Sequence, residues 1–423
     1  MPDIVERNIN SYSSPSQLRI SDMRIANIVG APFRATIIRL DTNQGLSGYG
    51  EVRDGASASY ALLLKNRILG ENPCNVDRLF RKIKQFGHHA RQAGGVTAVE
   101  MALMDLAGRA YGVPAYQLAG GKFRERILCY CDTPSERDGT AMGRRLQERL
   151  ALGFKFLKMD VGIGLLRDVP GALSAPPGML ETNQVQHPFT GIQVTPKGIA
   201  FLVDYVAAVR DVIGYAVPLA ADHFGHIGLE SCIRVGQALD RFNLAWYEDM
   251  LPWQYTDQYV ALSRAVTTPI CTGEDIYLKE GFKPLLEARA VAVIHPDLAT
   301  SGGILETKKI GDLAQEYGVA MAMHMAASPI ATLASVHCAA ATENFLALEN
   351  HASDVPWWDD LVTGLPKPLV QDGHIAAPET PGLGFAGINE ELFRAHLNPA
   401  APIFFDTPTD GWDNERSWDR LWS

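Results

Sequence analysis

Three short apolar runs, each ending in an acid, follow one another in the middle of the chain: VPLAAD (217–222), LAWYE (244–248) and PICTGE (269–274). The terminal acids Asp222, Glu248 and Glu274 are separated by 26 residues in both steps (248 − 222 and 274 − 248). A strand, a helix and their two loops together take up about this length. The repeat therefore predicts consecutive parallel strands that are joined by helices.

Further apolar runs continue this spacing on both sides. They are ILCYC before Asp132, FKFL before Lys158, VAVIHP before Asp297, VAMAM before His324 and NFLAL before Glu349. Helix-like segments such as SCIRVGQALDRF (231–242) lie between the runs. The series predicts an α/β fold, a (β/α)₈ TIM barrel over residues 127–355, whose active site would lie at the carboxyl ends of the strands. A doubly wound sheet is the alternative, and it is disfavoured because no Gly-x-Gly-x-x-Gly follows an early strand.

Two regions flank this barrel and one interrupts it. Residues 1–126 contain the strand-like runs ATIIRLDTNQG and LSGYGEVRDG and the helical run VTAVEMALMDLAGRAYG, which predict an α+β domain. Residues 163–197 carry five prolines and form an insertion after the second strand, either shaping the site or a subunit interface, or inert. Residues 356–423 are predicted to be a C-terminal segment that returns to the first domain.

Composition excludes several classes of protein. The chain has 423 residues, of which 47% are hydrophobic and 20% charged, as in globular domains. Its net charge of −10 argues against a nucleic-acid partner or an acidic membrane surface. No window reaches the ~18 apolar residues of a membrane helix, the N-terminus lacks a signal-peptide core, and six cysteines in so long a chain are no disulfide framework. These features predict a cytoplasmic protein without a membrane partner.

The three acids at neighbouring strand ends point to a metal site. Adjacent parallel strands are ~4.8 Å apart, so carboxylates at their ends would repel one another or take up protons. A divalent cation would resolve that conflict, and ligation by oxygen alone favours Mg²⁺. Salt bridges from these acids to Lys or Arg are the alternative.

The next two strands add an acid and a base. Asp297 and His324 end consecutive runs, and a carboxylate beside an imidazole fixes its tautomer and raises its basicity. Lys158 stands on the opposite side of the predicted barrel. A lone histidine is more often structural, but this one follows three acids at matching spacing, which favours a catalytic role.

Taken together, these motifs resemble a known family. GYGE (48–51), ALMDLAGRAYGVP (102–114) followed by LAGG, the three-acid series, HPD (295–297) and MAMHM (321–325) are similar to the mandelate racemase/muconate lactonizing enzyme family of the enolase superfamily. The resemblance implies an N-terminal α+β capping domain, completed by C-terminal residues, on a modified (β/α)₈ barrel. It further implies that Asp222, Glu248 and Glu274 hold Mg²⁺, and that the His324–Asp297 dyad abstracts the proton α to a carboxylate to give a metal-stabilised enediolate.

The second strand departs from the family pattern. Related racemases carry Lys-x-Lys, whereas this chain has Lys158-Met159-Asp160. Lys158 matches the first Lys, which in the family contacts the substrate carboxylate, and Asp160 replaces the second. Because a dehydratase can work with one principal base, the pattern predicts a Mg²⁺-dependent hydro-lyase that converts a hydroxy acid, an acid sugar, into a 2-keto acid. A racemase, epimerase or cycloisomerase using the same enediolate is the alternative, and a binding protein that retained the barrel is a third, disfavoured by the intact acid–base and metal positions.

Residues that would contact the substrate are also predicted. Glu349 matches the eighth-strand acid that in the family hydrogen-bonds the substrate carboxylate, and Asp160, His226 and Arg53 are further candidates for substrate binding. Arg53 directly follows the GYGEV run in a predicted cap loop, and His226 lies four residues past Asp222. The expected partner is a small hydroxy acid, and the family resemblance implies a homo-oligomer, a dimer or an octamer.

Overall fold

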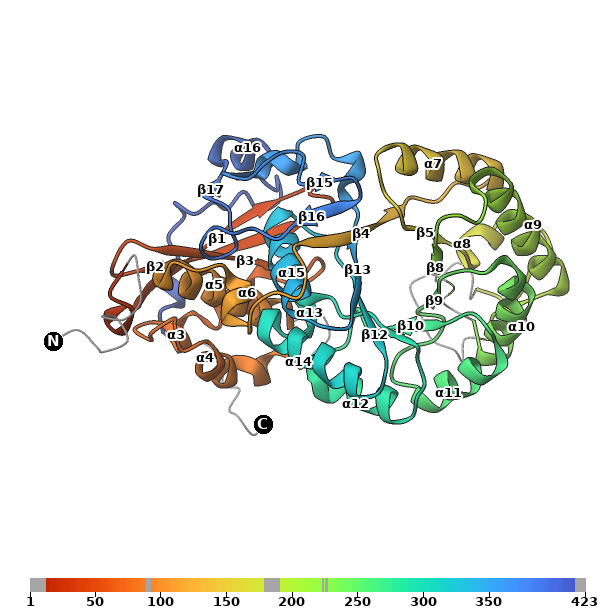
Figure 1. Ribbon diagram of the computed structural model, residues 1–423, viewed down its shortest axis with the longest axis horizontal. Coiled ribbons are helices and arrows are strands. Elements are labelled where there is room, and N and C mark those ends of the chain that lie inside the picture. Colours follow the sequence, from red (N-terminus) through yellow and green to blue (C-terminus); the bar gives the residue numbers. More distant parts are fainter. Residues whose placement is uncertain (1–12, 89–92, 179–190, 223, 225–226, 415–423) are drawn as a thin grey trace.

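The computed structural model describes residues 13–88, 93–178, 191–222, 224 and 227–414. A ring of strands surrounded by helices lies beside a smaller domain that contains the N-terminal strands, and the last part of the chain runs back over that domain (Figure 1). Among the described residues, no helix combines the length and the apolar character needed to cross a membrane.

Parallel strands form a closed barrel in the described part of the chain. In order around the ring they are β4 (Arg126–Thr133), β5 (Leu157–Asp160), β8 (Leu219–Asp222), β9 (Tyr247–Glu248), β10 (Ile270–Thr272), β11 (Val293–Ile294), β12 (Ala320–Met323) and β13 (Phe345–Asn350). The ring closes because β13 pairs with β4, with Leu348 opposite Cys129. This closure confirms the predicted eight-stranded barrel and excludes the open sheet.

Helices between the strands form the outer layer (Figure 1). They are α7 (Gly139–Ala151), α9 (Pro196–Ile213), α10 (Leu229–Leu239), α11 (Thr256–Ala265), α12 (Leu278–Glu287), α13 (Leu298–Ser301), α14 (Gly303–Glu316) and α15 (Pro329–Ala341). Short 3₁₀ turns are η1 (Pro15–Gln17), η2 (Lys84–Gly87), η4 (Asp240–Phe242), η5 (Ala352–Asp354), η6 (Trp358–Leu361) and η7 (Asp410–Trp412).

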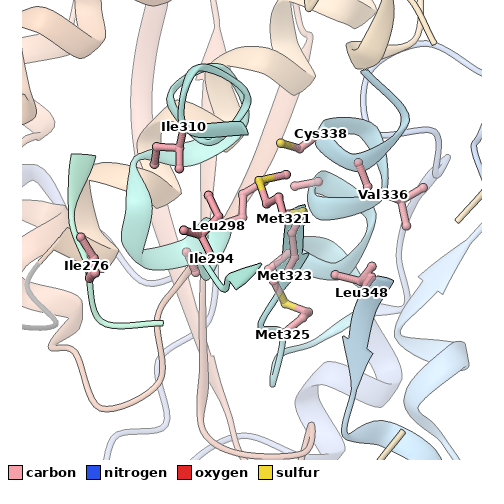
Figure 2. Close-up of a cluster of buried hydrophobic side chains, with 14 of the residues drawn as sticks. Ile276, Ile294, Leu298, Ile310, Met321, Met323, Met325, Val336, Cys338 and Leu348 are labelled. Atoms are coloured by element: carbon pink, nitrogen blue, oxygen red, sulfur yellow. The ribbon is translucent and has the colours of Figure 1, made fainter. Parts of the chain in front are cut away.

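Strand alternation separates the barrel interior from the layer under the helices. Ala322 of β12 belongs to the inner cluster with Tyr130 and Trp246. Its neighbours Met321 and Met323 belong to the outer cluster, and Figure 2 shows Met321, Met323 and Met325 among Ile294, Leu298, Val336 and Leu348. The packing of these methionines holds the end of β12, from which His324 extends.

The smaller domain is the predicted α+β cap. Its antiparallel sheet has the order β1 (Ile20–Ile28), β2 (Ala35–Thr42), β3 (Ser47–Val52), and its helices are α2 (Ala58–Leu62), α3 (Lys65–Ile68), α4 (Val76–Ile83), α5 (Ala93–Tyr111) and α6 (Ala115–Leu118). A Cβ on Gly50 would lie 1.9 Å from the Ala98 carbonyl oxygen of α5. The second glycine of GYGE therefore lets the sheet approach α5 closely.

The C-terminal segment touches both domains. The hairpin of β15 (Val370–Gln371) and β16 (His374–Ala376) pairs with β4 of the barrel, and β14 (Val362–Thr363) pairs with β17 (Gly387–Ile388). After α16 (Glu390–Ala395), Leu397 bridges Ile28 of β1, and the Asn27 N–H donates to the Ile403 carbonyl at 3.0 Å. C-terminal residues thus complete the cap, as the fold prediction states.

The insertion after β5 is partly described. It contains α8 (Ile163–Leu166) and a short antiparallel pair, β6 (Leu173–Ser174) with β7 (Gln193–Val194). Thr195 then caps α9 by accepting from the Gly198 N–H. The influence of this insertion on the site stays a prediction.

Two buried acids of the cap hold the amino ends of barrel helices. Glu51 of β3 accepts from the Ser328 N–H at 3.0 Å, the Ser328 hydroxyl at 2.6 Å and the Ala331 N–H at 3.1 Å, at the start of α15. Glu100 of α5 accepts from the Ile304 and Leu305 N–H groups of α14 at 2.6 and 3.0 Å. Helix amino ends leave such donors unsatisfied, so these carboxyls fix the cap against the barrel.

Candidate active site

The predicted polar residues gather at the carboxyl ends of the barrel strands. Asp222 and Glu248 are the last residues of β8 and β9, and Glu349 lies within β13. Glu274 and His324 follow β10 and β12, while Asp297 follows β11 and caps α13 by accepting from the Ala299 N–H at 2.6 Å. Parallel strands place these ends at one face, so residues far apart in sequence share one site.

Lys158 lies at the centre of the acidic cluster. Its Nζ is 2.8 Å from Asp222 Oδ2, 2.8 Å from Glu248 Oε1 and 2.6 Å from Glu349 Oε1. Burial by itself lowers the pKa of this lysine, but the three carboxylates outweigh burial and raise the pKa well above its ordinary value. Lys158 is therefore a fixed cation rather than a proton acceptor.

Glu248 is held from two further directions. Trp246 Nε1 donates to Glu248 Oε2 at 2.8 Å, and His295 Nδ1 is 3.1 Å from Oε1. Burial raises the pKa of Glu248, but His295 and Lys158 outweigh it and lower the pKa to about 2. Glu248 in turn raises the pKa of His295 to about 9, against the effect of burial. Sequence reasoning missed His295, although it stands in the HPD motif.

His324 and Asp297 form the expected pair, with an addition from the cap. His324 Nδ1 is 2.6 Å from Asp297 Oδ2, and Nε2 is 3.0 Å from Glu274 Oε2. Arg53 Nη1 contacts Asp297 and lies 2.8 Å from His324 Nδ1. The second guanidinium nitrogen, Arg53 Nη2, is 3.4 Å from Glu274 Oε1. Burial raises the pKa of Asp297, but Arg53 and His324 outweigh it and lower the pKa. Arg53, predicted as a substrate ligand, thus contacts the His324–Asp297 pair from the neighbouring domain.

The predicted metal ligands are paired with cations in this arrangement, as the salt-bridge alternative describes. Lys158 joins Asp222 to Glu248, and Arg53 and His324 contact Glu274. Yet the acids outnumber the fixed cations, because Lys158 and Arg53 share five carboxyl groups at the barrel mouth, those of Asp222, Glu248, Glu349, Glu274 and Asp297. A cluster of carboxylates with surplus negative charge fits a hard divalent cation.

Other side chains also bring ligand atoms together. Among the described residues, Glu248, Cys271 and His295 form one group with ligand atoms within 4.8 Å, and His324, Glu349 and His351 form another. Both groups include histidine nitrogen and the first also includes a thiol, whereas Mg²⁺ takes oxygen ligands. The carboxylate set therefore suits Mg²⁺ better than either group.

Three further residues were predicted to bind the substrate: Asp160, His226 and Glu349. Asp160 Oδ2 accepts from the Ser135 hydroxyl at 2.8 Å and lies opposite Asp222 in the sheet register. His226 lies outside the described residues. Glu349 Oε1 also contacts His351 Nε2 at 3.1 Å.

Comparison with known proteins decides the family. Residues 13–120 match the mandelate racemase/muconate lactonizing enzyme N-terminal domain, and residues 141–391 match the enolase C-terminal domain-like family. The chain belongs to the mandelate racemase/muconate lactonizing enzyme family. The sequence resemblance to this family within the enolase superfamily is thereby confirmed.

Relatives in this family include named dehydratases. The chain is 34% identical to D-xylonate dehydratase of Haloferax volcanii, over 87% of this chain and 86% of that protein. It is 26% identical to D-galactonate dehydratase of Xanthomonas axonopodis pv. citri, over 89% of this chain and 94% of that protein. Dehydratases are hydro-lyases, which is the enzyme class predicted from the sequence.

A solved structure in the family has the same fold. A mandelate racemase/muconate lactonizing enzyme-like protein from Rubrobacter xylanophilus superposes with a TM-score of 0.81 at 31% identity, covering 92% of this chain and all of that chain. The cap-and-barrel arrangement is thus common to this chain and to a crystallised member of the family.

Proposed function

We propose that this protein is a Mg²⁺-dependent acid-sugar dehydratase that converts a hydroxy acid into a 2-keto acid. The observation that carries the proposal is the unequal chemistry of the two sides of the site. His324, held by Asp297, can accept a proton, whereas Lys158 is a cation bound by three carboxylates. One base suits elimination, while racemisation of the familiar type uses a base on each face of the substrate.

Each residue has a defined task in this reaction. Lys158, which Glu349 contacts, binds the substrate carboxylate, and His324 Nε2 takes the α-proton while Nδ1–H donates to Asp297. The electron pair from the broken C–H bond moves into the carboxylate to form an enediolate. That pair then returns to form the C2–C3 double bond as the β-hydroxyl leaves with a proton as water, and the resulting enol takes a proton at C3 to become the ketone.

The metal would be held by Asp222, Glu248 and Glu274. A bound Mg²⁺ supplies electrostatic stabilisation of the charge that builds up on the carboxylate when the α-proton is removed. Lys158 contacts Asp222 and Glu248, and Arg53 contacts Glu274, so these cations would share the three carboxylates with the metal.

The substrate class rests on the relatives. The names of these relatives refer to D-xylonate and D-galactonate, both polyhydroxylated monocarboxylates. We therefore infer an aldonate or a closely related acid sugar as the substrate.

The test is a substrate screen with the purified protein and Mg²⁺. Aldonates and aldarates, D-xylonate and D-galactonate among them, are incubated with the enzyme, and 2-keto acids are detected with semicarbazide. We expect product from at least one acid, its loss with a chelator and its return with added Mg²⁺. No product across the panel would refute dehydration.

Proton NMR in D₂O tests the alternative isomerase. Exchange at the α-carbon together with inversion or ring formation, and with no loss of a hydroxyl group, would identify a racemase, epimerase or cycloisomerase. We expect loss of the hydroxyl. His324→Asn should abolish both exchange and elimination.

A further inference from the structure

A second histidine–carboxylate pair lies at the mouth of the barrel. His351 directly follows β13, and Asp132 lies on β4, the strand that closes the ring against β13. His351 Nδ1 is 3.3 Å from Asp132 Oδ2, and Nε2 is 3.1 Å from Glu349 Oε1. The pair repeats the arrangement of His324 and Asp297, which also come from neighbouring strands.

The surroundings of His351 keep a proton on the ring. Burial by itself lowers the pKa of His351, but the charges of Asp132 and Glu349 outweigh burial and raise the pKa from its ordinary value. A carboxylate oxygen lies 3.3 Å from Nδ1 and another lies 3.1 Å from Nε2, so negative charge faces both nitrogens of the ring. His351 is thus held as an acid, while Asp132 fixes its orientation.

The position of His351 also suits contact with a substrate. Its side chain is 17% exposed, whereas that of Lys158 is 2% exposed. The rings of His351 and His324 have centroids 5.9 Å apart, and Glu349 lies between them, with Oε2 3.8 Å from His324 Nε2. A molecule bound at Glu349 therefore meets both histidines.

Other groups near the site are less suited to donate a proton. The Lys158 ammonium is bound by three carboxylates, and Asp160 accepts from Ser135. Arg53 remains charged beside Asp297.

We propose that His351 is the general acid of the dehydration and that Asp132 is its positioning residue. The inference rests on the proposed function and adds the group that releases the β-hydroxyl. After His324 has taken the α-proton, the C–O bond breaks, its electron pair stays on oxygen, and His351 Nε2 gives its proton to that oxygen, so that water leaves. The substrate hydroxyl replaces the contact of Nε2 with Glu349, and solvent returns the proton to His351.

The first test separates proton removal from hydroxyl loss. In His351→Asn, formation of the 2-keto acid should fall by about a hundredfold or more, the usual share of a general acid. Exchange of the α-proton with D₂O should persist, because His324 and Asp297 are unchanged. His374→Asn is the matched control, since His374 lies on β16 outside the mouth and its Nδ1 contacts the Asp372 carbonyl; it should keep wild-type turnover.

The second test replaces the leaving group. Fluoride departs as an anion and needs no proton, so the substrate analogue with fluorine in place of the β-hydroxyl should release fluoride from His351→Asn at a rate close to that of the wild type. Asp132→Asn should show a smaller loss of hydroxyl elimination, about tenfold, with α-exchange and fluoride release retained. A ratio of exchange to elimination that rises in this variant is a readout that a purely structural role would not move.

The outcomes are distinguishable. A wild type that neither exchanges nor eliminates with any acid refutes the proposed function and this inference with it. With an active wild type, undiminished water elimination by His351→Asn overturns the inference alone. Loss of exchange, water elimination and fluoride release together in a folded His351→Asn also overturns it, because the residue would then serve binding or structure.

Discussion

Two groups of buried acids in this protein have pKa values that are shifted in opposite directions. At the interface of cap and barrel, burial outweighs the hydrogen bonds and raises the pKa of Glu51 to about 7 and that of Glu100 to about 8. At the barrel mouth, burial acts in the same direction, but charged partners outweigh it and lower the pKa of Glu248 and of Glu274 to about 2. Burial is common to both groups, so the partners make the difference.

The partners also separate the roles of the two groups. Glu51 and Glu100 accept from backbone N–H groups, and Glu51 also from a serine hydroxyl, which hold the domains in register without a compensating charge. Glu248 and Glu274 face lysine, histidine and arginine, so they stay ionised and available to a cation. Changing an interface acid should therefore affect stability, and changing a mouth acid should affect chemistry.

The largest expected effect is at the mouth. Glu248→Gln removes a charge from the proposed Mg²⁺ site, so turnover should fall about a thousandfold or more while the protein stays folded by circular dichroism. Isothermal titration calorimetry should show weaker Mg²⁺ binding. Glu287→Gln on the surface of α12 is the control, and full turnover in Glu248→Gln would contradict the ligand assignment.

Glu100→Ala tests the role of an acid at the interface of cap and barrel. This change leaves the Ile304 and Leu305 N–H groups without their carboxylate and opens a cavity, so the free energy of unfolding should fall by about 3 to 5 kcal/mol. Urea denaturation measures it, with Glu316→Ala at the exposed end of α14 as the control. Equal stability of the two variants would show that Glu100 does not hold the domains together.

The pH dependence of stability should differ in sign between the two groups. The pKa of Glu51 is raised from 4.5 to about 7, so the folded protein retains a proton that the unfolded chain releases above pH 4.5. This contribution is complete below pH 4.5 and is lost as the pH rises through about 7, with a total of about 3 kcal/mol. For Glu248, the contribution is present above pH 4.5 and is lost as the pH falls through about 2.

Urea titrations at pH values of about 5 and 8.5 check this prediction. Wild-type stability should fall over that range, and Glu51→Gln should fall by less because its amide does not titrate. Parallel curves for the two proteins would mean that Glu51 is ionised throughout.

The smallest expected effect is the change in Mg²⁺ affinity when Lys158 is replaced. Its ammonium contacts two proposed metal ligands, so Lys158→Met should raise the affinity for Mg²⁺ about tenfold, or about 1.4 kcal/mol, while turnover is lost. Calorimetric titration measures the affinity, with Lys155→Met, an exposed lysine near β5, as the control. Weaker binding in Lys158→Met would show that the lysine assembles the ligands rather than competing for them.

Much of the fold could be predicted because it depends on local pattern. The spacing of about 25 residues between strand-end polar groups led to the barrel, and the acids Asp222, Glu248 and Glu274 were found by the same count. The structure brings Asp297 and His324 into contact, as their consecutive strands led us to expect. Such inferences succeed because parallel strands place their carboxyl ends at one face whatever the loops do.

Contacts between elements far apart in the chain could not be predicted from the sequence. Asp132 was seen as a strand end, but its contact with His351 requires that the eighth strand close against the first. Arg53 was expected at the substrate, yet docking of the cap directs it to Asp297, 244 residues away. Local spacing therefore determined which acids and bases stand at the mouth. Barrel closure and cap docking decided which of them touch, because those partners are set by packing between elements and not by distance along the chain.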